Sequence, residues 1–168
     1  MAESHRFPRL FVASDLQCGA EVPASDSQAH YLLNVMRCRS GDGVILFNGR
    51  DGEWNATLVQ IGKKGAAFKP DARRRAQTAP PDVTLIFAPM KTARLELLVE
   101  KATELGVTHF VPIITRHSVV SRVNQARLLA IATEAAEQCE RMTVPAFAPL
   151  GSIETIADWR AAHPGRPV

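Results

Sequence analysis

The stretch that decides the fold is residues 83–114, VTLIFAPMKTARLELLVEKATELGVTHFVPII. It opens with an apolar run at 83–88, which is typical of a buried strand. A stripe of apolar residues at helical spacing follows, and Gly106 favours the end of that helix. The stripe consists of Leu95, Leu98, Val99, Ala102 and Leu105. A second apolar run at 109–114 predicts another strand, so the stretch reads as the strand–helix–strand unit of a parallel sheet.

The same alternation continues along the second half of the sequence. Asn124 can cap a further helix, one face of which is apolar. That face carries Leu128, Ala132, Ala135 and Cys139. A short run at 144–148 predicts a third strand, and residues 153–159 predict another helix. The second half is therefore expected to be an α/β domain with a parallel sheet.

The first half of the sequence has a different period. Residues 25–28, SDSQ, form a capping-box pattern, and apolar residues follow it at helical spacing. These residues are Ala29, Leu32, Leu33 and Met36. Short strands are expected at 9–13, 44–47, 54–59 and 66–69. Asn48-Gly49 with Asp51-Gly52 indicates a hairpin. The first half is thus predicted to be a small, mostly antiparallel β-barrel or sheet with one helix.

A boundary is expected around residues 73–82. Three arginines at 73–75 precede Pro80-Pro81, and two prolines interrupt both helix and strand. We therefore expect a domain at 1–74, a linker at 75–82 and a second domain at 83–168. The arginine run has two interpretations: a solvated linker, or a contact with a nucleic-acid backbone.

The amino-acid composition limits the partners, the location and the metal binding that we expect for this protein. Hydrophobic residues make up 46% of the chain, and 20 Lys and Arg face 17 Asp and Glu, a net charge of +3. This mildly basic balance permits a nucleic-acid partner without requiring one. No apolar run approaches the roughly 20 residues of a membrane span, so we expect a cytoplasmic protein with no membrane partner. The three cysteines have no metal-ligand spacing, and we expect no metal.

Two clusters in the first half are candidates for RNA contacts. Arg6 and Arg9 flank Phe7 and Pro8, and such a segment can grip phosphates; a solvated tail is the other interpretation. His30, Asn34 and Arg37 are spaced along the expected helix on its polar side. A plain solvated helical face is the alternative for this second cluster.

Two further clusters lie in the second half. Lys91 and Arg94 follow the first expected strand, and Arg116 follows the second. Loops at the carboxyl ends of parallel strands are where α/β proteins bind ligands. The last cluster is on the second helix and beyond it, and consists of Glu134, Glu137, Gln138, Glu140 and Arg141. A surface helix with ordinary ion pairs is the alternative for that cluster.

Taken in order, these residues resemble the RsmE family, the 16S ribosomal RNA uridine-N3 methyltransferases of the SPOUT superfamily. The resemblance rests on a collinear set of short matches along nearly the whole chain. In the first half these are Arg6-x-Pro-Arg9, His30-x6-Arg37, Gly41-Asp42 and Phe47-Asn-Gly49. In the second half these are Lys91, residues 100–107 EKATELGV, Pro112, Arg116, Ser118-Val-Val120, residues 134–138 EAAEQ, Arg141 and Val144-Pro145.

The resemblance implies a PUA-like RNA-binding barrel followed by a knotted SPOUT methyltransferase domain that works as a homodimer. It implies methyl transfer from S-adenosylmethionine (SAM) to N3 of a uridine in 16S rRNA of the small subunit. The implied RNA contacts are Arg6, Arg9, His30 and Arg37. The implied active-site edge or dimer face consists of Lys91, Arg94, Arg116, Glu137, Gln138 and Arg141. No catalytic residue can be named.

The sequence departs from the family pattern in one respect, which changes the activity that we expect. The family continues with a Gly-Pro-Glu-Gly-Gly loop and a Leu-Gly-x-Arg-Ile-Leu-Arg-x-Glu-Thr segment, which form the knot and the SAM pocket, and this sequence has neither. We therefore expect a truncated chain that holds only part of the SPOUT sheet and is inactive alone. The alternatives are an RNA-binding module without catalytic activity and a metabolic α/β enzyme that clamps a phosphate with Lys91. Common signatures such as G-x-G-x-x-G and the Walker A loop are absent, which argues against the latter.

Overall fold

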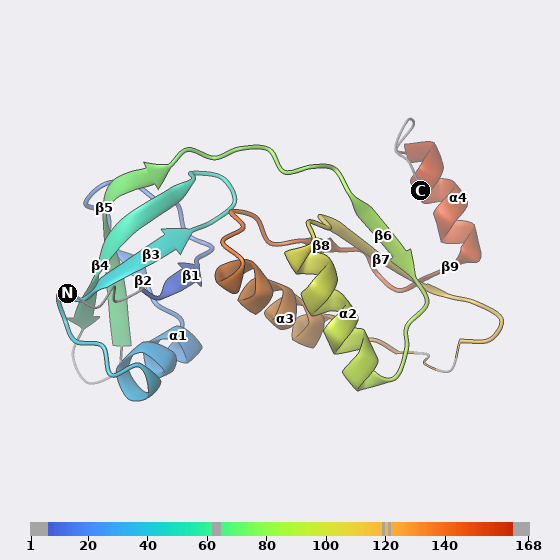
Figure 1. Ribbon diagram of the computed structural model, residues 1–168, viewed down its shortest axis with the longest axis horizontal. Coiled ribbons are helices and arrows are strands. Elements are labelled where there is room, and N and C mark those ends of the chain that lie inside the picture. The colour runs from blue at the N-terminus through green and yellow to red at the C-terminus, as the bar shows by residue number, and fades with distance from the viewer. Residues whose placement is uncertain (1–6, 62–64, 119, 121, 163–168) are drawn as a thin grey trace. The chain divides into compact units, whose positions relative to one another are not determined.

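The computed structural model describes residues 7–61, 65–118, 120 and 122–162 (Figure 1). The chain forms two compact units, Met1–Thr78 and Ala79–Val168. Each unit has its own cluster of buried apolar residues.

The first unit is built on one sheet with the strand order β1-β3-β4-β5-β2. Its strands are β1 (Arg9–Phe11), β2 (Val22–Pro23), β3 (Gly43–Phe47), β4 (Glu53–Ile61) and β5 (Gly65–Arg75). Strand β1 runs parallel to β3, and the other pairs are antiparallel. The prediction of a small, mostly antiparallel sheet is thereby confirmed.

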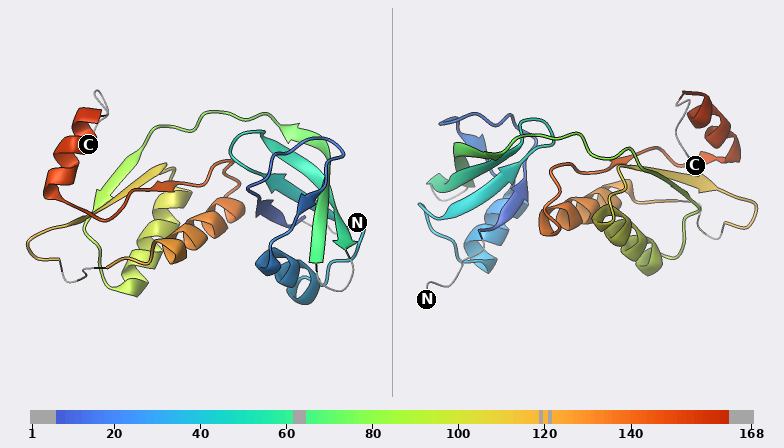
Figure 2. Two further views of the ribbon diagram at one scale, coloured as in Figure 1. Left: turned by 180° about the vertical axis from the view of Figure 1, so that it is seen from behind. Right: turned by 45° about the horizontal axis from the view of Figure 1, so that its top comes forward.

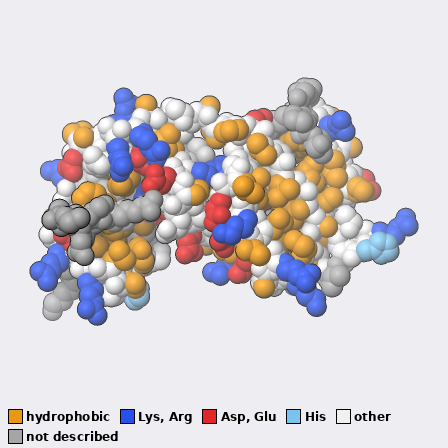
Figure 3. All heavy atoms as spheres, viewed as in Figure 1, with side chains coloured by type: hydrophobic (Ala, Val, Ile, Leu, Met, Phe, Trp, Pro, Cys, Tyr) orange, Lys and Arg blue, Asp and Glu red, His pale blue; other side chains and the backbone are white. Residues whose placement is uncertain are grey.

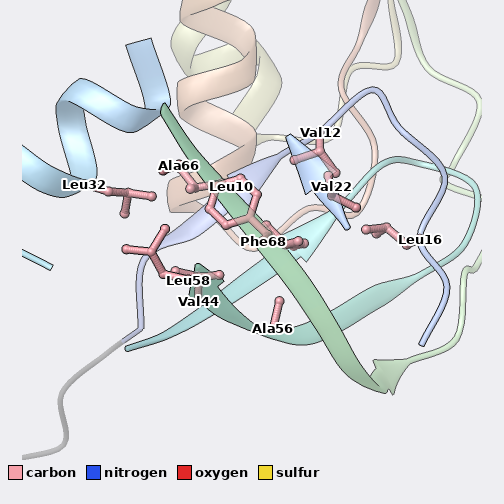
Figure 4. Packing of buried hydrophobic residues seen from close by; sticks show 11 residues of the cluster. Leu10, Val12, Leu16, Val22, Leu32, Val44, Ala56, Leu58, Ala66 and Phe68 are labelled. Carbon is pink, nitrogen blue, oxygen red and sulfur yellow. The ribbon is translucent and has the colours of Figure 1, made fainter. Parts of the chain in front are cut away.

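The core of this unit lies on one face of the sheet. Leu46, Leu58 and Phe68 come from three neighbouring strands and are fully buried. Figure 4 shows Leu10 and Phe68 at the centre of the cluster, with Leu32 of the helical segment reaching it from the side. The predicted alternation along β4 is confirmed, because Ala56 and Leu58 are buried and Trp54 packs against them.

The helical segment begins as predicted and then departs from the expected geometry. Helix α1 (Asp26–His30) is capped by Ser25, and both hydrogen bonds of the capping box with Gln28 are present. The chain then widens into a π-helix, η1 (Tyr31–Val35). The helical spacing predicted Met36 on the buried face, and this is wrong. The wider turn of η1 shifts the period, so that Leu32 is buried and Met36 is 45% exposed.

The arginine run belongs to β5 and not to a linker. The interpretation of residues 73–75 as a solvated linker is wrong, and the expected short strand at 66–69 extends to Arg75. Two register shifts against β4 explain why the sequence did not show this strand. Glu53 pairs with Arg75 while Trp54 pairs with Arg73, so Arg74 is an extra, bulged residue. Bulges break the strict alternation by which strands are recognised.

The hairpin between β3 and β4 is tied to the loop after β1. Asn48 is buried, and its Nδ2 donates to the Ser14 carbonyl at 3.0 Å and to Asp51 Oδ2 at 2.6 Å. Asp51 Oδ2 also accepts from the Leu16 amide at 2.9 Å. The Phe47-Asn-Gly49 part of the family pattern therefore has a structural explanation.

The second unit is a parallel sheet with helices. Its elements are β6 (Thr84–Phe87), α2 (Thr92–Glu104), β7 (His109–Ile114), α3 (Gln125–Gln138), β8 (Ala146–Phe147), β9 (Gly151–Ser152) and α4 (Ile153–Ala162). Strand β7 is central, pairing in parallel with β6 on one side and with β8 and β9 on the other. Helices α2 and α3 pack together on one face, and α4 lies on the opposite side (Figures 1 and 2). The predicted parallel α/β order is confirmed.

The ends of α2 and α3 follow the expected chemistry. Gly106, at φ 105°, closes α2, with its amide donating to Thr103 and the Val107 amide donating to Ala102. This is the Schellman arrangement. Asn124 caps α3 by accepting from the Arg127 amide at 3.1 Å.

Two residues expected on the buried faces of these helices are exposed. Leu105 is 87% exposed, and Cys139 is exposed as well. Both lie at C-cap positions, where the helical period ends, so the spacing no longer predicts their direction. Thr103 is buried in α2, although the apolar stripe did not include it.

The described residues contain neither a membrane-spanning helix nor a cluster of metal ligands. No helix in this part of the chain is long and apolar enough to cross a membrane. No group of three or more His, Cys, Asp or Glu side chains among the same residues is arranged to hold a metal ion.

Candidate functional site

A buried carboxylate gathers arginines in the first unit. The Glu53 side chain is only 3% exposed, and its Oε1 accepts from Arg9 Nε at 2.7 Å. Arg75 donates two hydrogen bonds to the same carboxylate, from Nε at 2.8 Å and from Nη2 at 2.7 Å. Arg74 Nε lies 3.6 Å from Oε2. The β5 bulge brings both neighbouring arginines to one side, because the extra residue breaks the alternation of side chains.

The electrostatics of Glu53 follow from this arrangement. Burial alone would raise its pKa, but hydrogen bonds from Arg75 and Arg9 outweigh burial and hold the pKa below its ordinary value. Arg9 is also fixed from its other side, since its Cζ lies 3.8 Å from the centroid of the Phe47 ring. The Glu53 carboxylate is thus ionised and enclosed near neutral pH.

The predicted RNA-binding residues are placed in different settings. Arg6 lies outside the described residues. The Arg9 side chain is only 8% exposed and bound to Glu53, so it has a structural role that the sequence did not suggest. His30 ends α1 and Arg37 follows η1, and both are exposed. RNA contacts at these positions stay a prediction.

Three predicted cations follow the carboxyl ends of neighbouring parallel strands. Lys91 is the N-cap of α2 after β6, Arg94 lies in the first turn of that helix, and both are exposed. Arg116 follows β7 and is exposed in a turn. That turn is closed by Ser118 Oγ, which accepts from the Thr115 amide at 2.8 Å. Because β6 and β7 are parallel partners, these cations belong to one edge of the sheet.

The rest of the predicted group lies at the other end of the sheet. Helix α3 returns from that edge and ends at Gln138, so Glu137, Gln138 and Arg141 lie near the amino ends of the strands. Arg141 Nη1 donates to the carbonyls of Thr103 at 2.5 Å and Val107 at 2.8 Å. It therefore caps the C-terminus of α2, and burial lowers the pKa of its guanidinium.

Sequence reasoning missed the two structural anchors. Nothing in the local sequence marked Glu53 as buried, although it lies opposite Phe47 in the hairpin and opposite Arg75 in the next strand pair. An acidic residue at an inward strand position next to a run of arginines is the signal that was available. Arg141 gave no such signal, because its acceptors are backbone carbonyls more than 30 residues away.

Comparison with known proteins assigns the chain to a family. A family model described as the RNA methyltransferase domain matches residues 77–163, and one described as the RNA methyltransferase PUA domain matches residues 24–71. A relative in Rickettsia conorii named ribosomal RNA small subunit methyltransferase E is 36% identical over 141 residues, 83% of this chain and 58% of the relative. The chain belongs to the RsmE family of RNA methyltransferases.

A second relative and two solved structures extend the comparison of this RsmE-family chain. The Synechocystis protein of the same name is 35% identical over 83% of this chain and 46% of its own length. The Neisseria gonorrhoeae enzyme of that name, solved with bound SAM, has a TM-score of 0.77 at 26% identity over 96% of this chain and 66% of its own. A Legionella pneumophila protein solved with SAM, 24% identical over 91% of this chain and 66% of its own, supports the fold alone with a TM-score of 0.81. The chain thus spans about half of the curated relatives it matches.

Proposed function

We propose that this chain is part of an enzyme that transfers a methyl group from SAM to N3 of a uridine in 16S rRNA of the small ribosomal subunit. The observation that carries the proposal is the collinear match of the two domain models with relatives named ribosomal RNA small subunit methyltransferase E. A radiolabelled methyl-transfer assay on small subunits, with digestion of the product to nucleosides, tests it. Label in any nucleoside other than N3-methyluridine would contradict it.

The two units are assigned separate tasks in this proposal. The first unit binds RNA as a PUA-like domain, which the match to the PUA family model supports. The second unit contributes to a SPOUT-type methyltransferase sheet, knotted in its complete form and paired with a second copy in a cytoplasmic homodimer. Its parallel strand order and its helices on both sides of the sheet support this assignment.

The described residues do not by themselves provide a fitting site for SAM. The loops after β6 and β7, residues 88–91 and 115–124, contain no glycine that would let a backbone approach a nucleoside. The charged residues at this edge include Lys91, Arg94 and Arg116, which repel the positive sulfonium of SAM. These residues are better suited to an anionic partner. We therefore propose that this chain alone does not bind SAM and is inactive.

Calorimetric titration of SAM into the chain tests this point, after mass spectrometry has confirmed both ends. We expect no binding by this chain and binding by a longer form that continues past Val168. Micromolar binding by this chain would contradict the proposal. In that case the donor site would lie within these residues.

The cations at the carboxyl edge have a chemical use in the proposed reaction. N3 of uridine is a weak acid, and it attacks a methyl donor only when its proton is removed or the resulting charge is stabilised. Arg116, exposed on its closed turn, would favour the anionic base by electrostatic attraction.

RNA binding by the first unit predicts a strong dependence on salt. Each phosphate neutralised by a cation contributes about one to the slope of log affinity against log salt. We expect Arg6→Ala and Arg37→Ala to lower the slope by about one each. Arg9→Ala is expected to change the slope less, because Glu53 already neutralises that charge. A flat salt response of the unmodified chain would contradict RNA binding.

A second function is an RNA-binding module without catalytic activity. The absence of glycine from residues 88–91 and 115–124 favours this second function for the present chain. It predicts salt-dependent RNA binding without methyl transfer by either this chain or a longer form. Activity of the longer form would exclude it.

A further inference from the structure

An exposed apolar patch lies on the π-helix of the first unit. Tyr31 is 38% exposed, Val35 60% and Met36 45%, although each is a large hydrophobic side chain. We call these three residues the η1 patch. Leu32, between them in sequence, is fully buried, so the segment is anchored while the patch faces solvent.

The π-helical geometry is what brings the patch together. The Met36 amide donates to the Tyr31 carbonyl at 2.9 Å, a bond between residues five apart. In an α-helix, residues five apart point about 140° from each other. In the wider π-turn the same two residues lie closer to one face of the segment. Single π-turns of this kind are frequent at functional sites.

Two arginines and a histidine flank the η1 patch in the sequence. His30 precedes it, and Arg37 and Arg39 follow it, all three exposed. Arg37 adopts φ 56°, a left-handed backbone that non-glycine residues rarely take. The carboxylate of the neighbouring Asp42 accepts a hydrogen bond from the Arg39 backbone amide at 2.7 Å. Asp26 lies a turn away, at the start of α1. Figure 3 shows Lys and Arg side chains beside hydrophobic ones over this end of the first unit.

We propose that the η1 patch binds an unpaired RNA base, which stacks on Tyr31 while Arg37 and Arg39 contact the flanking phosphates. The proposal rests on the proposed RNA-binding function and adds that the partner segment is single-stranded. An aromatic ring among cations fits an unpaired nucleotide, because a splayed base offers an apolar face and its backbone offers negative charge. An RNA duplex keeps its base faces stacked inside the helix.

The chain itself provides a selective probe of this contact. Tyr31 is the only tyrosine in the sequence. Selective isotopic labelling of tyrosine therefore gives the ring signals of one residue in a nuclear magnetic resonance spectrum. On titration with oligouridylate we expect these signals to shift, because a stacked base changes the magnetic environment of the ring. A blunt RNA duplex of matched length should leave them in place.

Substitutions at Tyr31 separate stacking from apolar contact. Tyr31→Leu keeps an apolar side chain but removes the ring, and we expect it to lower affinity for oligouridylate about tenfold. Tyr31→Phe keeps the ring and is the matched control, with affinity within about twofold of the unmodified chain. Arg37→Gly keeps the left-handed backbone without strain and removes the charge, so the salt slope should fall by about one.

The outcomes separate this inference from the function on which it rests. If oligouridylate binds with a steep salt slope while the Tyr31 signals stay fixed, the stacking site is wrong and RNA binding stands. If the signals broaden with protein concentration in the absence of RNA, the η1 patch is a contact between copies, which also overturns the inference. If no RNA binds, both proposals fall.

Discussion

Each unit holds the side chain of one arginine in its interior, but the two arginines bind different kinds of acceptor. In the first unit, Arg9 is drawn inward by a buried carboxylate, Glu53, and stacked on Phe47. In the second unit, Arg141 is drawn inward by two backbone carbonyls at the end of α2. Arg9 was expected to contact RNA, and Arg141 was expected at an active-site edge or dimer face. The position of Arg9 therefore depends on the strand register that places Glu53 beside it, whereas the position of Arg141 depends on the packing of its segment against the C-terminus of α2.

Removing Glu53 should produce the largest effect. Glu53→Ala removes the carboxylate that the buried Arg9 guanidinium binds, so we expect the first unit to lose about 3–5 kcal/mol of stability. Urea denaturation followed by fluorescence measures this, in a Trp159→Phe background where Trp54 reports on the first unit alone. Asp15→Ala breaks an exposed ion pair with Arg50 in the same unit and is the matched control. It should change stability little. Equal losses in the two variants would mean that the Glu53 centre is not a special anchor.

Removing Arg141 should have a smaller effect on the second unit. Arg141→Ala removes the side-chain donor from two partly buried carbonyls, of which Thr103 keeps the Gly106 amide, so we expect a loss of about 2 kcal/mol. Far-ultraviolet circular dichroism during denaturation follows α2 and α3. Arg127→Ala is the control, because it breaks an exposed pair with Glu96. If both variants unfold at the same urea concentration, Arg141 does not cap α2 to any useful extent.

The turn beside that cap offers a milder test. Gly106→Ala places a side chain at φ 105° with no atom within 4 Å of the new Cβ, so only backbone strain is added. We expect a loss of about 1–2 kcal/mol in the second unit. Gly52 differs, because a Cβ there would lie 2.3 Å from the Arg75 carbonyl oxygen. Gly52→Ala should therefore destabilise the first unit more, and the reverse ranking would contradict the packing around β5.

The two anchors also predict a difference in acid. Glu53 has a lowered pKa in the folded chain, so its contribution to stability is present above its ordinary value of 4.5 and is lost as pH falls through the folded pKa. The Arg141 anchor does not titrate in this range. Below about pH 4.5 the first unit should weaken more steeply than its Glu53→Gln variant in denaturation series at several pH values. Parallel curves for the two proteins would show that Glu53 does not set the acid response.

The sequence predicted those features that depend on neighbouring residues. The capping box at Ser25, the Gly106 turn and the Asn124 cap are local, and all three are confirmed. The parallel strand order followed from the alternation of apolar runs and helical stripes. These patterns need no knowledge of which distant segments meet.

The features that were missed depend on distant partners or on irregular backbone. The length of β5 was hidden by bulges, and the exposure of Met36 by a π-turn. Of the candidate sites, Lys91 and Arg116 could be placed at one sheet edge from strand order alone. Arg9 could not be placed, because its burial depends on Glu53, 44 residues along the chain.

The Arg141 cap also has a consequence for the order of events during synthesis. Its acceptors, Thr103 and Val107, leave the ribosome 38 and 34 residues before the donor. At typical elongation rates that interval lasts several seconds, far longer than a helix needs to form. The local hydrogen bonds of the Gly106 turn can form during this interval, whereas those of Arg141 form only after α3 has emerged and packed against α2. The two hydrogen bonds of Arg141 are therefore among the last local contacts of α2 to form as the chain is synthesised.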